Sequence, residues 1–373
     1  MQTKSKIREF SEKIKKYNDV IDFTIGDPQE LINEEIEEIT IESIRKGKTH
    51  YSSNVGEESL IKEIVRKEIF YKEDEIYITS GATQGLFEIL MSLLKKDDGH
   101  NYSFKYGNIF YKVSGEGKPV LLIHDINECS SGMEWLYLEK KLSKTNRVYT
   151  IDLLGCGRSD KPKLNYNNFL YVQLITEFIR DVIGEPVDMI ATGKSAAPVI
   201  MATKLREEDV DRIILINPVD LAEIADVPDK FSKIKKIFFS CPIIGTFIYH
   251  MLHRKDAVFN YFMNDGFSDS CADFTEICDY YHESAHRDKS GSKYLFASLE
   301  GGSLNMNINH GLKVLDKDIV IISGDDYYES EYVPEEYAEL NENIECISIT
   351  ETSYLPQLED PSRVMDIIHE YWK

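Results

Sequence analysis

The sequence predicts an α/β protein whose larger part is a mostly parallel sheet covered by helices on both faces. From residue 102 onward, short and nearly continuous apolar strands alternate with helical stretches, a pattern typical of strands buried on both sides. A shorter α/β segment precedes this part. The polar stretch KKDDGHN, residues 95–101, separates the two and carries an Asp-Gly turn signal. We therefore expect a segment at 1–98 followed by the larger domain.

Composition excludes several classes of function. The chain of 373 residues has 43 Lys and Arg against 65 Asp and Glu, a formal charge of −22. With no excess of basic residues, we expect neither general nucleic-acid binding nor binding to anionic membranes. The six cysteines form no C-x-x-C pair and the first residues show no signal-peptide pattern, which favours a cytoplasmic location. The longest apolar run, 237–252, is too short for a membrane span and predicts a helix pair.

The first 98 residues carry three recognisable segments: DFTIGDP at 22–28, HYSSNVGEESLIKEI at 50–64 and IYITSGATQGLFEIL at 76–90. Together they resemble the N-terminal portion of class I/II, fold type I, PLP-dependent aminotransferases. The resemblance implies that one turn bound the cofactor phosphate at a helix N-terminus, where free N–H groups suit an anion. That turn comprises Ser80, Gly81, Ala82, Thr83 and Gln84.

The remainder of an aminotransferase is missing after Gly99. No later segment supplies the Schiff-base lysine that this chemistry requires. We therefore expect no bound PLP and no aminotransferase activity, and interpret residues 1–98 as a retained folding or dimerisation module. Its strand at 75–79 would expose unpaired edges alone, so we expect it to pack on the larger domain or on a second copy of the chain in a homo-oligomer. A PLP- or phosphate-binding protein remains an alternative.

The larger domain begins with an ordered series of strands and helices. Helices are expected at 170–183 and 195–207, on either side of the strand that precedes Ser195. The expected strands are 108–113, 119–124, 147–152, 187–191, 212–217, 318–323 and 345–349. Between 221 and 312 the sequence is helical in pattern and rich in aromatic residues.

Three segments of this domain resemble the α/β-hydrolase fold family: 117–162, GKSAA at 193–197, and YLPQLEDPSRVMDIIHEYW at 354–372. The resemblance spans about residues 102–373. It implies a hydrolase core at 99–220 and 313–373, with 221–312 forming a helical cap over the active site. Such a cap walls a pocket for a small, largely apolar substrate or ligand.

The resemblance also implies a nucleophile and an oxyanion hole. GKSAA matches the nucleophile elbow G-x-S-x-G, which makes Ser195 the predicted nucleophile, flanked by the small Gly193 and Ala197. The oxyanion donors would be the backbone N–H groups of Ala196 and Ile126. A carboxylate, Asp125, replaces the family's glycine before Ile126.

The acid and the base are less well matched. Asp326 or Asp325 could orient a base, although the family position three residues after Gly324 is Tyr327; Asp220 is a further position for the acid. Tyr354 stands where the family has histidine. A tyrosine is a poor general base at neutral pH.

The sequence therefore predicts a relative of serine esterases and epoxide hydrolases whose catalysis is impaired and which binds a small molecule or a partner. An active hydrolase of small apolar esters, using Ser195 with a displaced histidine, remains the alternative; His282, His286 and His310 are the possible bases. Residues 282–286 also match H-E-x-x-H, a zinc motif when helical. Such matches arise by chance, and no metal site is expected.

Overall fold

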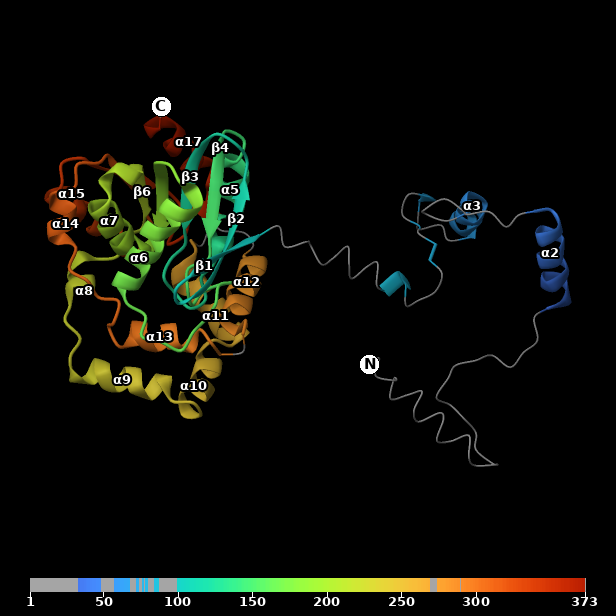
Figure 1. Ribbon diagram of the computed structural model, residues 1–373, viewed down its shortest axis with the longest axis horizontal. Coiled ribbons are helices and arrows are strands. Elements are labelled where there is room, and N and C mark those ends of the chain that lie inside the picture. The colour runs from blue at the N-terminus through green and yellow to red at the C-terminus, as the bar shows by residue number, and fades with distance from the viewer. Residues whose placement is uncertain are drawn as a thin grey trace. The chain divides into compact units, whose positions relative to one another are not determined.

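The computed structural model describes residues 33–47, 57–67, 72–73, 76, 78–79, 84–86, 99–268, 274–288 and 290–372. The chain divides into two compact units, 1–96 and 97–373, which are drawn together in Figure 1. In the first unit, helix α2 spans Glu34–Arg45 and helix α3 spans Glu58–Lys67. The Asn33 side chain caps α2 by accepting from the Glu35 N–H at 2.9 Å. Of the predicted phosphate turn, Gln84 begins a short described helical stretch, whereas Ser80, Gly81, Ala82 and Thr83 lie outside the described residues.

The second unit is built on one eight-stranded sheet in the order β1-β2-β4-β3-β5-β6-β7-β8 (Figure 1). β1 and β2 pair antiparallel, as do β2 and β4, and the remaining pairs are parallel. The strands are β1 His100–Phe104, β2 Gly107–Ser114, β3 Lys118–Ile123, β4 Asn146–Ile151, β5 Val187–Thr192, β6 Val210–Ile216, β7 Ile319–Gly324 and β8 Ile344–Ile349. The predicted α/β class with a mostly parallel sheet is confirmed; β1, which the sequence did not reveal, extends its antiparallel edge.

Alternate residues of each central strand face different helical layers, because side chains alternate along a strand. In β3, Leu121 and Ile123 belong to the core cluster on one face, whereas Val120 and Leu122 belong to the other. All four are fully buried, which explains why the strand reads as an unbroken apolar run. The first face is covered by α6 Asn168–Phe178, α7 Ala196–Leu205, α14 Asn309–Lys313 and α15 Val333–Leu340; the second by α5 Leu136–Leu142 and α17 Pro361–Tyr371.

A helical cap is inserted between β6 and β7. It begins with α8 Leu221–Ala225 and continues through α9 Lys230–Ser240, α10 Ile244–Leu252, α11 Lys255–Tyr261, α12 Thr275–His286 and α13 Lys293–Glu300. Helix α9 packs against both α10 and α13. None of the helices in the described part of the chain combines the length and apolarity needed to cross a bilayer.

One buried carboxylate holds the loops that follow β3 and β4. Asp152 accepts from the Gly132 N–H at 2.6 Å and, through its other oxygen, from the Arg158 N–H at 2.7 Å. Its side chain is nearly inaccessible to solvent. Both hydrogen bonds are partly buried, and without the carboxylate these two N–H groups would lose their protein partner.

Replacing this carboxylate should therefore destabilise the fold. Asp152→Asn keeps the shape but has one acceptor oxygen, so one of the two N–H groups loses its partner at a cost of about 1–3 kcal/mol. Asp160→Asn is the matched control, because exposed Asp160 accepts from the Asn108 N–H at 2.7 Å where water can substitute. Urea unfolding of both variants gives the comparison. If Asp152→Asn lowered the free energy of unfolding no more than the control does, this account would be contradicted.

Candidate functional site

The turn between β5 and α7 has the geometry of a nucleophile elbow, with the strain at a different residue from the one expected. The positive φ, +56°, belongs to Gly193. Ser195 has φ −69° and ψ −15°, ordinary right-handed helical values. Because the elbow's nucleophile occupies the strained residue of the turn, the apex lies two residues before the predicted Ser195.

The Ser195 hydroxyl and the Ala196 N–H are both hydrogen-bonded to backbone carbonyls. The Ser195 hydroxyl is fully buried and donates to the His124 carbonyl at 2.5 Å. The Ala196 N–H donates to the Gly193 carbonyl. The structure therefore does not give these two groups the geometry expected of a nucleophile and an oxyanion donor, since the hydroxyl is bonded to the backbone that follows β3 and the N–H is bonded inside the turn.

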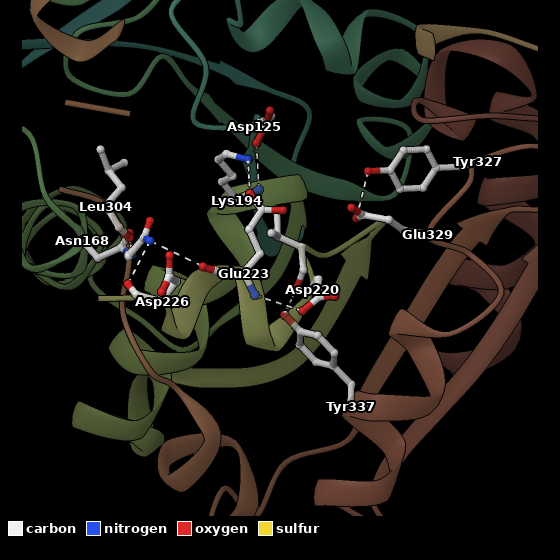
Figure 2. A network of polar contacts seen from close by, with 12 residues as sticks. Asp125, Asn168, Lys194, Asp220, Glu223, Asp226, Leu304, Tyr327, Glu329 and Tyr337 are labelled. Atoms are coloured by element: carbon white, nitrogen blue, oxygen red, sulfur yellow. Dashed lines mark hydrogen bonds and ion pairs between the residues drawn. The ribbon is translucent and has the colours of Figure 1, made fainter. Parts of the chain in front are cut away.

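The side chain of Asp125, from the loop after β3, lies over Gly193 at the apex of the turn. Its carboxylate accepts from the Lys194 N–H at 2.7 Å, the interaction drawn in Figure 2. Lys194 directly follows Gly193, so its N–H stands where an elbow offers an oxyanion donor. A Cβ atom added to Gly193 would lie 2.5 Å from the Asp125 carboxylate and closer still to the Tyr354 hydroxyl. The turn has no room for a side chain at its apex.

Tyr354 completes the contact with Asp125. Its hydroxyl donates to the Asp125 carboxylate. Asn217, at the end of β6, fixes this segment by donating from Nδ2 to the carbonyls of Ser353 and Tyr354, at 3.0 and 2.9 Å. Burial and the nearby Asp125 charge raise the pKa of Tyr354 well above its usual value. The side chain at the predicted histidine position is thus a fixed hydrogen-bond donor.

The predicted acids are not brought to Tyr354. Asp325 accepts from the Glu351 N–H at 2.8 Å, and Asp326 accepts from the Ser268 hydroxyl of the cap. Asp220 caps α8 by accepting from the N–H groups of Ala222 and Glu223, at 2.6 and 3.0 Å. These carboxylates stabilise turns and the seam between cap and core.

Tyr327 lies at the remaining family position. Its ring centroid is 5.1 Å from that of Tyr354. Its hydroxyl donates to the Glu329 carboxylate at 3.0 Å (Figure 2). Two tyrosine rings therefore face each other where the family resemblance implied an acid and a base.

Two cavities adjoin Asp125 and Tyr354 below the cap. Their volumes are about 200 Å³ and about 550 Å³. Both are lined by Asp125, Asn127, Glu128, Tyr261 and Tyr354. The larger cavity is also lined by Ile126, the predicted oxyanion donor, whereas Ser195 and Ala196 line neither.

The three histidines considered as displaced bases also line neither cavity. His282 and His286 lie on α12, where the His286 ring bonds the His282 carbonyl at 2.9 Å. Glu283, the would-be base of the H-E-x-x-H motif, pairs with Arg287 at 2.6 Å. His310 lies on α14.

His253 is the histidine that reaches the smaller cavity, and no sequence motif pointed to it. It lies at the end of α10, with Nε2 2.6 Å from the Glu128 carboxylate and Nδ1 2.7 Å from the Tyr249 carbonyl. Burial alone would lower the pKa of His253, but hydrogen bonding and charge from Glu128 raise it overall. Both ring nitrogens therefore act as donors in a buried ion pair that joins cap to core.

Among the described residues, one group of side chains could hold a metal ion. It comprises Glu128, Cys129 and His253, whose donor atoms lie within 4.8 Å of one another. Their present contacts do not favour one. Both His253 nitrogens are engaged. Burial, followed by the Glu128 charge, raises the pKa of Cys129 well above its usual value and keeps it a thiol.

A second buried carboxyl group supports Asp125 from behind. Glu134 accepts from the Asp125 N–H at 3.0 Å and from the Tyr281 hydroxyl of α12 at 2.8 Å. Burial, with a further contribution from the Asp125 charge, raises the pKa of Glu134 to about 8. Glu134 is therefore largely uncharged at neutral pH, which removes repulsion between the two carboxyl groups.

Comparisons with known proteins agree with this architecture. A model of the alpha/beta hydrolase family matches residues 120–367. Among solved structures, the serine hydrolase of carbazole degradation, the CarC enzyme, superposes with a TM-score of 0.60 at 16% identity, covering 74% of this chain and 98% of that one. A likeness at this identity establishes the fold.

Curated relatives match shorter parts. A 2-hydroxy-6-oxo-6-(2'-aminophenyl)hexa-2,4-dienoic acid hydrolase of Metapseudomonas resinovorans is 26% identical over 113 residues, 30% of this chain and 39% of the relative. An aspartate aminotransferase of Pyrococcus horikoshii is 33% identical over 103 residues, 26% of each chain. The chain thus spans less than two fifths of the length of these relatives. The aminotransferase character of residues 1–98 stays a prediction.

The raised pKa of Glu134 predicts a pH-dependent stability. Folding favours the protonated carboxyl, so its contribution is complete below about pH 4.5 and is lost as the pH rises through about 8. Glu134→Gln still accepts from the Asp125 N–H but does not titrate. Between about pH 5 and 8, the free energy of unfolding should fall more steeply in the parent than in Glu134→Gln, by at most about 1.4 kcal/mol per pH unit. Denaturant unfolding across this range tests it; parallel curves would show that Glu134 does not titrate there.

Proposed function

Because the chain belongs to the alpha/beta hydrolase family, we propose that it is a catalytically silent member that binds a small molecule beneath its cap. One observation carries the proposal: the Asp125 carboxylate, held by the Lys194 N–H, lies where a nucleophile and its oxyanion would meet. Hydrolysis through a tetrahedral intermediate needs that N–H for the developing negative charge. Burial raises the pKa of Asp125, against the opposing effects of Lys194 and the Tyr354 hydrogen bond. The carboxyl group occupies the N–H in either form, and its ionised form repels the developing charge.

Two further features support the loss of chemistry. Gly193 supplies no nucleophile at the apex of the turn, and Tyr354 is a hydrogen-bond donor rather than a base. Losing members of a triad that act as a unit removes most of the rate enhancement, on the order of 10⁴–10⁶-fold. The alternative, an active hydrolase using Ser195, would need that hydroxyl to leave the His124 carbonyl and reach a cavity.

A fluorophosphonate probe separates the two functions. We expect no labelling of the parent, because its single elbow serine is buried and bonded to backbone. A variant that combines four substitutions should become labelled, and peptide mass spectrometry should locate the label at residue 193. The substitutions are Asp125→Gly, Gly193→Ser, Tyr327→Asp and Tyr354→His. The same set without Gly193→Ser is the control and should remain unlabelled.

Labelling of the parent at Ser195, abolished by Ser195→Ala, would instead establish the active-hydrolase alternative. Circular dichroism of each variant confirms that a negative result comes from a folded protein.

The lining of the larger cavity indicates the class of ligand. Five carboxylates line it. Three of them already pair with a cation, Glu128 with His253, Glu223 with Lys194 at 3.6 Å and Glu300 with Lys235 at 3.8 Å, which leaves Asp125 and Glu329. Aromatic side chains supply much of the remaining wall. The carboxylates are Asp125, Glu128, Glu223, Glu300 and Glu329, and the aromatic residues are Tyr261, Phe296, Tyr327, Tyr328 and Tyr354. Carboxylates with aromatic faces bind organic cations by charge and cation–π attraction, so we infer a small amine with apolar substituents.

Choline and its uncharged carbon isostere, 3,3-dimethyl-1-butanol, test this class directly because they differ in charge and hardly in shape. Titration calorimetry should show choline binding at least about tenfold more tightly, equivalent to about 1.4 kcal/mol. Asp125→Asn should reduce that preference, whereas Glu370→Gln on α17, which lines neither cavity, should leave it unchanged. Equal affinities, or a preference for the alcohol, would contradict a cationic ligand.

A further inference from the structure

The outer surface of the cap exposes large apolar side chains on two consecutive helices, α9 and α10. The exposed fraction reaches 73% at Ile237 and 82% at Ile243. We call this surface the outer cap face; it comprises Val227, Phe231, Ile234, Ile237, Phe238, Ile243, Ile244, Phe247 and Met251. Both helices lie at the edge of the cap, beyond α13, in Figure 1.

The spacing of these residues gathers them on one side of each helix. On α9, apolar residues follow one another at three- and four-residue steps: Phe231, Ile234, and then Ile237 or Phe238. On α10 the same spacing holds for Ile244, Phe247 and Met251. This spacing places each set on a single face of its helix. The opposite side of α10 packs inward, since Gly245 and Tyr249 are buried. Because α9 and α10 pack against each other, the two exposed stripes lie on neighbouring helices, and large exposed apolar surfaces mark interaction sites.

The charge of this surface is opposite to that of the chain. Residues 227–252, which span this face, contain four lysines and one acidic residue, Asp229, the N-cap of α9, in a chain with 65 acidic and 43 basic residues. Lys235 pairs with Glu300 at 3.8 Å, and Lys236 donates to the Ser303 hydroxyl at 2.9 Å. For Lys230 and Lys233 the described residues provide no ion-pair partner.

Contrary to the expectation from net charge alone, we propose that the outer cap face docks in the plane of an anionic lipid surface. A helix with an apolar stripe and lysines beside it inserts its stripe at the headgroup boundary while the lysines meet lipid phosphates. The net charge of −22 excludes general attraction to such a surface. Docking therefore depends on the lysines and the apolar stripe of this one face.

Charge also decides against a second copy of the chain as the occupant. A two-fold contact places the same patch on both partners. The lysines of one outer cap face would then meet those of the other.

Vesicle flotation of the full chain tests the proposal. We expect the protein to float at low salt with vesicles of phosphatidylcholine and phosphatidylglycerol in equal parts. Added salt should release it, because salt screens the lysines. The protein should not float with vesicles of pure phosphatidylcholine. The pair Ile237→Asp and Phe247→Asp should abolish flotation, and the pair Lys230→Glu and Lys233→Glu should weaken it at least tenfold.

Leu205→Asp is the matched control, because Leu205 is 66% exposed and is the last residue of α7, whose opposite end carries the elbow beneath the cap; this variant should float like the parent. All substituted side chains are exposed, and circular dichroism verifies folding. Absence of flotation with the anionic vesicles, or flotation unaffected by the Asp pair, would overturn the proposal. Concentration-dependent dimers that the Asp pair dissociates, without vesicle binding, would assign the face to a second copy.

Discussion

The hydrogen bond from the Lys194 N–H to the Asp125 carboxylate governs the geometry of the whole site. A buried carboxylate must find donors or become neutral, and Asp125 has the elbow N–H and the Tyr354 hydroxyl. That arrangement fills the space over Gly193, so the apex of the turn admits no side chain. The identity of residue 193, the orientation of Tyr354 and the shape of both cavities all depend on one carboxyl group.

Buried polar contacts also determine where the cap sits. Tyr281 donates to Glu134, His253 pairs with Glu128, and Ser268 donates to Asp326, each joining a cap residue to a core residue. Buried ion pairs contribute little net stability. These contacts instead select one position of the cap. In that position each polar group has its partner, whereas any other position of the cap would leave a buried polar group unpaired. The cap is thereby fixed over Asp125 by polar contacts as well as by the apolar packing of α11 and α12 against Leu355.

The sequence predicted the fold well because the fold depends on patterns that survive substitution. Runs such as Val120 to Ile123 are apolar throughout, since both faces of the sheet are covered. The order of strands and helices follows from these runs. Tyr354 was identified as the residue at the histidine position for a similar reason, because the segment 354–372 retains enough of the family pattern to be aligned.

The elbow could not be assigned from sequence because two registers satisfy the same rule. Small residues flank Ser195 at Gly193 and Ala197, but they also flank Gly193, at Ala191 and Ser195. Only the backbone dihedral angles distinguish the two, and the positive φ is at Gly193. His253 was missed for another reason. Its partner Glu128 is 125 residues away in the chain, a contact that no local pattern records.

The crowded apex of the elbow constrains how this protein can change. A serine arriving alone at residue 193 would collide with Asp125 and Tyr354 and would hold a positive φ at a cost of about 1–3 kcal/mol that glycine avoids. A single change of Asp125 or of Tyr354 would remove the hydrogen bond between them and would still leave no nucleophile. No single step toward an active triad is therefore favourable. Under the proposed loss of catalysis, the mutual steric and polar dependence among these three residues opposes a return to activity.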